Sequence, residues 1–254
     1  MGGHSGVEID KGRANACQIM GRVLYELYKE IPFSLCSLNG GLKDNAIPRQ
    51  AEAVIVCPKK RQSEINTKIA EISAEIKHEF LETDPMILVE AKETTLVEKE
   101  LTMTKDSADK VITALLCLPG GIQKMSFRMK GLVKTSLNLG IMKTQRDHVS
   151  LSFSVRSSVE SEKRALLNRI ICLTKTLGGT VTANGDYPAW EYLEKSPLRD
   201  LMCRIFEEQY GREPIVEALH AGVECGIFAG KILGLDCVSF GPDMKDIHTP
   251  KESM

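Results

Sequence analysis

The 254-residue sequence lacks most of the patterns by which a metal site or a cofactor site is recognised. It contains no C-x-x-C, no H-x-x-x-H, no glycine-rich P-loop and no dinucleotide-binding fingerprint. Its eight cysteines stand singly, mostly within apolar segments. They are therefore expected to be reduced, buried thiols, with neither a disulfide framework nor a zinc knuckle.

An excess of charge and long apolar runs are also missing. The formal net charge is -1, so the sequence has no excess of positive charge that would indicate binding to nucleic acid or to an acidic membrane surface. No apolar stretch approaches the roughly 18 residues needed to span a bilayer, and no secretory signal is visible. With 43% hydrophobic and 26% charged residues, the composition is typical of a globular cytoplasmic protein.

What the sequence does contain is a series of alternating helices and strands that occurs twice. The first series is a helix over residues 12–30, the strands "FSLCSLNGG" and "AEAVIVC", a helix with apolar residues from Ile65 to Phe80, and the strand "MILVEA". The second series is a helix over residues 107–118, the strands "LVKTSLNLGIMKT" and "VSLSFSV", another helix and the strand "TVTANG". That last helix begins at "SSVE", where Ser157 and Glu160 have capping-box spacing, and ends at Gly178.

Two repeated α-β-β-α-β units predict an α/β fold class with a doubled ferredoxin-like sandwich over residues 1–185. The units are expected at about residues 1–95 and 96–185. Residues 186–254 contain a helix, the strand-like runs "PIVEAL" and "LDCVSFG", and a short helix at "HAGVECG". These are too few residues to cover a buried strand on both faces, so this part is expected to belong to a larger α/β domain.

Each candidate functional residue has an ordinary structural explanation when it is taken alone. His4 in "GGHSG" and Asn45 in "NGGLKDNAIPR" fit turns, and Arg156 at a strand end fits a surface ion pair. The "HAGVECG" run is explained equally well as a helix start. His248 in "GPDMKDIHTPKE" is placed like a metal ligand in a rigid turn, but no second ligand lies near it in the sequence.

Taken together and in order, these motifs resemble one family. The order "GGHSGVEIDKGRANA", "NGGLKDNAIPR", "FSVRSS", "GDYPAW", "HAGVECG" and "SFGPDMKDIHTPKE" is similar to that of the aminoacyl-histidine (Xaa-His) dipeptidases, a family of co-catalytic zinc peptidases. The resemblance covers nearly the whole chain. It implies a doubled lid domain at residues 1–185 and the C-terminal part of a partial α/β zinc-peptidase catalytic domain at 186–254. It also implies that the N-terminal half of the catalytic domain precedes Met1.

The same resemblance implies roles for six residues. His4 would stabilise the oxyanion that develops on the scissile carbonyl. Asn45 and Arg156 would bind the substrate, and Arg156 would contact the carboxylate of the substrate. Gly222 and Glu224 would line the same pocket. His248 would bind one of two Zn ions, with Co or Mn as alternatives. The implied partner is a dipeptide substrate, with no nucleic acid and no membrane, and a homodimer is possible.

Two functions of different class follow. The first is a fragment of a cytoplasmic metallodipeptidase that hydrolyses Xaa-His and related dipeptides with metal-activated water. The isolated chain would be inactive, because the other metal ligands and the general base lie outside it. The second is a stand-alone ferredoxin-like binding or assembly module without catalysis. The presence of His4, Asn45, Arg156 and His248 favours the first, since a scaffold has no use for a metal-binding histidine.

Overall fold

The structure is a computed structural model that describes residues 1–94, 102–218, 220, 224–242 and 253–254. The chain divides into two compact units, Met1–Ala183 and Asn184–Met254. Each unit is described by itself. The first consists of helices and antiparallel strands, which confirms the predicted mixed α/β class in its coarse form.

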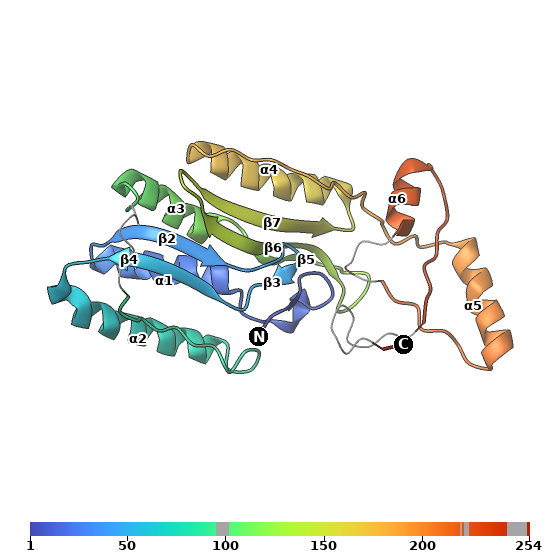
Figure 1. Ribbon diagram of the computed structural model, residues 1–254. Coiled ribbons are helices and arrows are strands. Elements are labelled where there is room, and N and C mark those ends of the chain that lie inside the picture. The colour runs from blue at the N-terminus through green and yellow to red at the C-terminus, as the bar shows by residue number, and fades with distance from the viewer. Residues whose placement is uncertain (95–101, 219, 221–223, 243–252) are drawn as a thin grey trace. The chain divides into compact units, whose positions relative to one another are not determined.

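Four helices of the first unit bury one apolar stripe each. They are α1 (Ala16–Glu30), α2 (Gln62–Glu79), α3 (Lys105–Cys117) and α4 (Glu160–Thr176). Figure 1 shows them with the strands of the same unit. The isoleucines of α2 at positions 65, 69, 72 and 76 recur every three or four residues and are all buried, as the sequence predicts.

The main sheet has five antiparallel strands, β2 (Ser34–Gly40), β4 (Ala51–Val56), β5 (Gly121–Met125), β6 (Val133–Thr144) and β7 (Val149–Ser157). Strand β6 joins the two halves of the unit. One of its edges pairs with β7 over nearly its full length. Its other edge is shared, because its first residues pair with β5 and Met142 and Lys143 pair with Gly40 and Asn39 of β2.

A second, very small sheet lies at the start of the chain. Strand β1 (Gly3–His4) pairs antiparallel with β3 (Ala46–Ile47), so that His4 lies opposite Ala46. Two single-turn 3₁₀ helices, η1 (Ile9–Lys11) and η2 (Lys59–Arg61), complete the unit.

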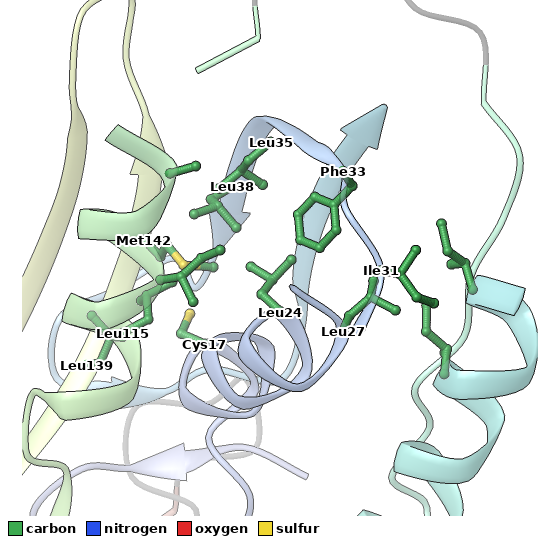
Figure 2. Packing of buried hydrophobic residues seen from close by; sticks show 14 residues of the cluster. Cys17, Leu24, Leu27, Ile31, Phe33, Leu35, Leu38, Leu115, Leu139 and Met142 are labelled. Atoms are coloured by element: carbon green, nitrogen blue, oxygen red, sulfur yellow. The ribbon is translucent and has the colours of Figure 1, made fainter. Parts of the chain in front are cut away.

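The core lies between the helices and the main sheet. Its largest cluster takes residues from α1, α2, α3, β2 and β6, and Figure 2 shows Leu24, Leu38, Leu115 and Met142 packed in it around Cys17. A second cluster joins Leu137 of β6 to Leu166 and Ile170 of α4, with Phe153 and Val155 of β7 packed against it. Because the apolar residues of β7 alternate, its other residues point away from the helices, as the sequence predicts.

Both predicted closing strands are wrong. Residues 86–91 and 180–185 form no strand. In the first, Ile87 and Val89 do point inward and pack beside α2, whereas Met86 and Leu88 are 81% and 71% exposed. The alternation is therefore present, but the segment pairs with no strand in the described part of the chain. Strand β5 is an addition that the sequence did not predict.

The proposed capping box of α4 is also wrong, because the N-cap residue is Val159 and no side chain caps the helix. The Ser157 hydroxyl instead accepts a hydrogen bond from the Val159 amide. The predicted end of α4 is confirmed. Gly178 has a φ of 81°, and its amide and that of Gly179 bond back to Lys175 and Thr174.

The cysteines only partly match the expectation. All eight are free, but Cys17 and Cys36 are the only buried ones, and Cys117 and Cys172 are exposed. Burial raises the pKa of the Cys17 thiol to about 12. The expectation of buried thiols failed because cysteines in amphipathic helices occupy either face.

The second unit contains two helices and no strand element among its described residues. Helix α5 (Pro197–Tyr210) begins at Ser196, whose hydroxyl accepts from the Arg199 amide and donates to Asp236. Helix α6 (Glu224–Lys231) packs Gly226 and Gly230 against the "GDYPAW" segment. Residues 214–218 and 235–241 are not strands, contrary to prediction. No helix in the described parts of the chain is both long enough and apolar enough to cross a bilayer.

Candidate functional site

The imidazole of His4 is oriented by the turn that follows it. Its Nδ1 accepts hydrogen bonds from the backbone amides of Gly6 and Val7, at 3.1 and 3.2 Å. A ring nitrogen that accepts carries no proton, so the neutral tautomer has its proton on Nε2. His4 therefore has a hydrogen-bond donor at the far end of its ring.

The glycines before His4 allow a charged pair to approach the backbone closely. The Glu8 carboxylate accepts from the His4 amide at 2.8 Å and pairs with Arg13 at 2.9 Å. Arg13 also donates to the Gly2 carbonyl at 2.5 Å. A Cβ on Gly3 would lie 2.3 Å from an Arg13 nitrogen, so a side chain there would displace the Arg13 guanidinium. The "GGHSG" motif thus holds β1 and His4 in a closed turn.

Asn45 lies beside His4 because the loop that carries it is attached to β1. The Ser5 amide donates to the Asn45 carbonyl at 2.9 Å, next to the His4 and Ala46 pair. The same loop crosses β6 at Gly140, where the register between β6 and β7 shifts. A Cβ on Gly140 would lie 2.4 Å from the Asp44 carbonyl oxygen. Glycine is required there because two backbones are in contact.

Arg156 lies near the same loop, on β7. It pairs with Ser136 of β6, and the next pair along, Leu137 and Val155, faces the helices. Alternation therefore directs Arg156 to the opposite face of the sheet. Burial lowers the pKa of its guanidinium, and the Asp44 carboxylate opposes this shift. Its Nε is buried and has no hydrogen-bond partner among the residues that the structure describes.

The first unit thus brings three of the six predicted site residues together. His4 and Asn45 meet through the β1–β3 pairing, and Arg156 lies within electrostatic reach of Asp44, the neighbour of Asn45. A donor on His4 and a half-buried guanidinium with an unsatisfied N–H suit an anionic ligand such as a carboxylate.

The other three predicted residues belong to the second unit of the chain. Glu224 is the exposed first residue of α6 in the second unit. Gly222 and His248 lie outside the described residues. Within the described ranges, no group of three His, Cys, Asp or Glu side chains could hold a metal ion. The described residues therefore do not by themselves fit a zinc site.

Sequence reasoning missed two residues at this place. Asp44 balances the charge of Arg156, and Asn138 of β6 contacts the loop that carries Asn45. A signal for Asn138 was present in the sequence, because it is a lone amide in the apolar run "LNLGIM". An amide that the fold buries in such a strand needs hydrogen-bond partners.

Comparisons with known proteins agree with this architecture. Residues 1–84 match the family model of the peptidase dimerisation domain. The chain is 30% identical over 253 residues to the cytosol non-specific dipeptidase of Escherichia coli (strain K12), covering 100% of this chain and 52% of that protein. A crystal structure of aminoacylhistidine dipeptidase from Vibrio alginolyticus matches 99% of this chain and 51% of its own, with a TM-score of 0.89 and 30% identity.

The chain therefore spans about half the length of the relatives it matches. The match covers both compact units of this chain. The match to the dimerisation domain lies within the first unit. The resemblance predicted from the sequence motifs is confirmed: the chain is similar along nearly its whole length to an aminoacylhistidine dipeptidase and to a cytosol non-specific dipeptidase, and residues 1–84 match the model of a peptidase dimerisation domain.

Proposed function

We propose that this chain supplies the substrate-binding lid of a cytoplasmic dipeptidase that hydrolyses Xaa-His and related dipeptides. Residues 1–185 would be the lid, built from two ferredoxin-like units that lack their closing strands. Residues 186–254 would be the C-terminal part of the catalytic domain. Support comes from the order of elements in the first unit, where each half has strands between two helices, and from the unit boundary at residue 183.

The observation that carries the proposal is the arrangement of His4, Asn45 and Arg156. Arg156 would bind the substrate carboxylate with two N–H groups, because a half-buried guanidinium with an unsatisfied Nε matches that ligand. His4 would donate from Nε2 to the carbonyl oxygen as negative charge develops there. The Asn45 side chain, exposed on the loop between them, would orient the dipeptide.

The remaining catalytic groups would come from the half of the relatives' length that this chain does not span. Two zinc ions would supply the activated water, with His248 as one ligand and Gly222 and Glu224 near the substrate. The match to a dimerisation domain supports a homodimer. The exposed apolar residues of the second unit, which include Leu201 and Ile205 of α5, support a catalytic domain that extends beyond these residues.

The test measures the binding of the dipeptide Gly-His to the 254-residue chain by calorimetry or NMR titration. Arg156→Lys is expected to weaken binding at least about tenfold, because an ammonium cannot reproduce a planar two-bond contact. Gly-histidinamide has no carboxylate, so it should bind to the unaltered chain as weakly as Gly-His binds to Arg156→Lys. Arg146→Lys, an exposed arginine in the turn between β6 and β7, is the matched control and should change nothing.

Equal binding of the acid and the amide would overturn the assignment of Arg156. The chain alone is also expected to leave Gly-His unhydrolysed, since its described residues contain no metal-binding cluster. Hydrolysis that a chelator abolishes would show that this chain suffices for catalysis. That result would contradict the proposal that the remaining catalytic groups lie elsewhere.

A further inference from the structure

We infer that Asn138 is a positioning residue that clamps the loop of residues 44–46 onto β6 and thereby sets the positions of Asn45 and His4. Asn138 lies near the middle of β6 and is only 2% exposed. Its side chain hydrogen-bonds to Asn15 and to the backbone of the loop, so it would act through that backbone. The link to catalysis rests on the function proposed above.

The structure shows three hydrogen bonds made by the side-chain amide of Asn138. Its Nδ2 donates to the Asp44 carbonyl at 3.0 Å and to the Ala46 carbonyl at 2.8 Å. Its Oδ1 accepts from Asn15 Nδ2 at 3.1 Å. One side chain therefore joins the loop to the residue that begins helix α1.

Asn15 fixes which way round the Asn138 amide lies. The Asn15 oxygen accepts from the Cys17 and Gln18 amides at 3.0 and 3.1 Å and so caps α1. Its nitrogen must then point toward β6, where it also donates to the Leu139 carbonyl at 3.0 Å. Because Asn15 offers a donor, Asn138 must turn its oxygen to Asn15 and its nitrogen to the loop.

The clamp acts where the candidate residues are attached. Three consecutive loop carbonyls are used, those of Asp44 and Ala46 by Asn138 and that of Asn45 by the Ser5 amide. Ala46 is also the register partner of His4. A shift of the loop away from Asn138 would therefore move Asn45 and β1 together.

The position on β6 explains why the loop needs this clamp. One edge of β6 pairs with β5 at one end and with β2 at the other, and residues 138–141 between them carry no ladder pairing on that edge. The loop fills this gap and contacts β6 at Asn138 and Gly140. Side-chain hydrogen bonds from Asn138 attach the loop to β6 at this stretch, where that edge has no ladder pairing.

The test compares three variants of the 254-residue chain. Asn138→Leu keeps the size of the side chain and removes all three bonds. Asn15→Asp keeps the oxygen that caps α1 but presents a second acceptor to Asn138, which should turn its nitrogen away from the loop. Leu137→Val is the matched control, because Leu137 is the preceding residue on β6 and packs toward α4 on the other face.

The main measurement is NMR-detected hydrogen exchange of the Ser5 amide, which donates to Asn45. Asn138→Leu and Asn15→Asp should each speed this exchange at least about tenfold beyond any change in global stability, because local opening no longer requires breaking the clamp. Leu137→Val should change it only as much as the global stability changes. If Asn138→Leu does not fold, Asn15→Asp still decides, since it preserves the helix cap.

The second measurement is titration with Gly-His. If the unaltered chain binds the dipeptide, both clamp variants should weaken binding about tenfold while Leu137→Val leaves it unchanged. Failure of the unaltered chain to bind would count against the proposed function only, because the exchange of Ser5 still tests the clamp. Exchange at Ser5 that follows global stability alike in all three variants would overturn the inference.

Discussion

Glu162 illustrates how single residues join the elements of the first unit. It lies in the first turn of α4 and receives bonds from Lys134 at 2.9 Å, from the Thr135 hydroxyl at 2.7 Å and from Lys124 at 3.2 Å. Burial alone would raise the pKa of this carboxyl, but these three donors outweigh it and lower the pKa to about 2. Glu162 therefore fastens α4 to both β5 and β6.

This gives a prediction on pH dependence. The folded pKa of about 2 lies below the ordinary value of 4.5, so ionised Glu162 stabilises the fold fully above pH 4.5. That stabilisation is lost as the pH falls from 4.5 toward 2. Glu162→Gln should lower the free energy of unfolding by about 2–3 kcal/mol at pH 7 and by much less near pH 2.

Urea denaturation at a series of pH values measures the loss in the free energy of unfolding at pH 7 and near pH 2. Glu160→Gln, at an exposed position in the same helical turn, is the control and should cost well under half as much. A constant difference between Glu162→Gln and the unaltered chain across the whole pH range would show that the ion pairs are not the cause.

At this scale the sequence predicted residue types better than it predicted their partners. His4, Asn45 and Arg156 stand in recognisable motifs, and the structure brings them together. Asn138 was missed because its role depends on a loop roughly ninety residues away in the sequence. No local pattern contains that information.

At the scale of elements, the contact between Gly140 and the loop is the most restrictive. A Cβ on Gly140 would meet the carbonyl oxygen, Cα and carbonyl carbon of Asp44 at 2.4–2.7 Å. Gly41 also lies against this residue, since its Cβ would lie 1.8 Å from the Gly140 oxygen. These atoms are backbone and cannot move aside as a flexible side chain would.

We therefore predict that Gly140→Ala displaces the loop. The free energy of unfolding should fall by about 1–3 kcal/mol, as expected for overpacking, and Gly-His binding should be lost. Gly241→Ala is the matched control, because a Cβ there meets nothing within 4 Å. Thermal denaturation and the dipeptide titration measure the two effects. Unchanged binding in Gly140→Ala would show that the loop position does not matter for the ligand.

The elements themselves were predictable where the pattern within a segment decides the structure. The isoleucines of α2 and the alternation in β7 determine which face is buried, and both were correct. The segment at residues 86–91 has the same alternation and is not a strand. Alternation shows that one face is buried, but a strand also needs a free edge beside it, which only the assembled sheet supplies.

At the scale of the whole molecule, the two units differ in how well they are covered. The first has three clusters of buried apolar residues. In the second, α5 has no buried residue, and Leu233 and Phe240 are almost fully exposed. Few apolar residues are removed from water in the described part of the second unit, so its local stability should be low.

Limited proteolysis is expected to cut this chain first at or beyond residue 184. The product should be a resistant fragment close to Met1–Ala183, identified by mass spectrometry of the earliest time points. The unfolded chain, digested in denaturant, is the control for sequence preference of the protease. First cuts within the helices or strands of the first unit would contradict this prediction.

Strand β6 has a consequence for the order of events during folding. It pairs with β2 of the first half of the unit and with β5 and β7 of the second half, and its pairing of Asn39 with Lys143 closes a loop of roughly a hundred residues. Contacts at such separation form late and slowly. During synthesis on the ribosome, β2 and β4 can pair with each other at once, but the far edge of β2 stays open until β6 has emerged.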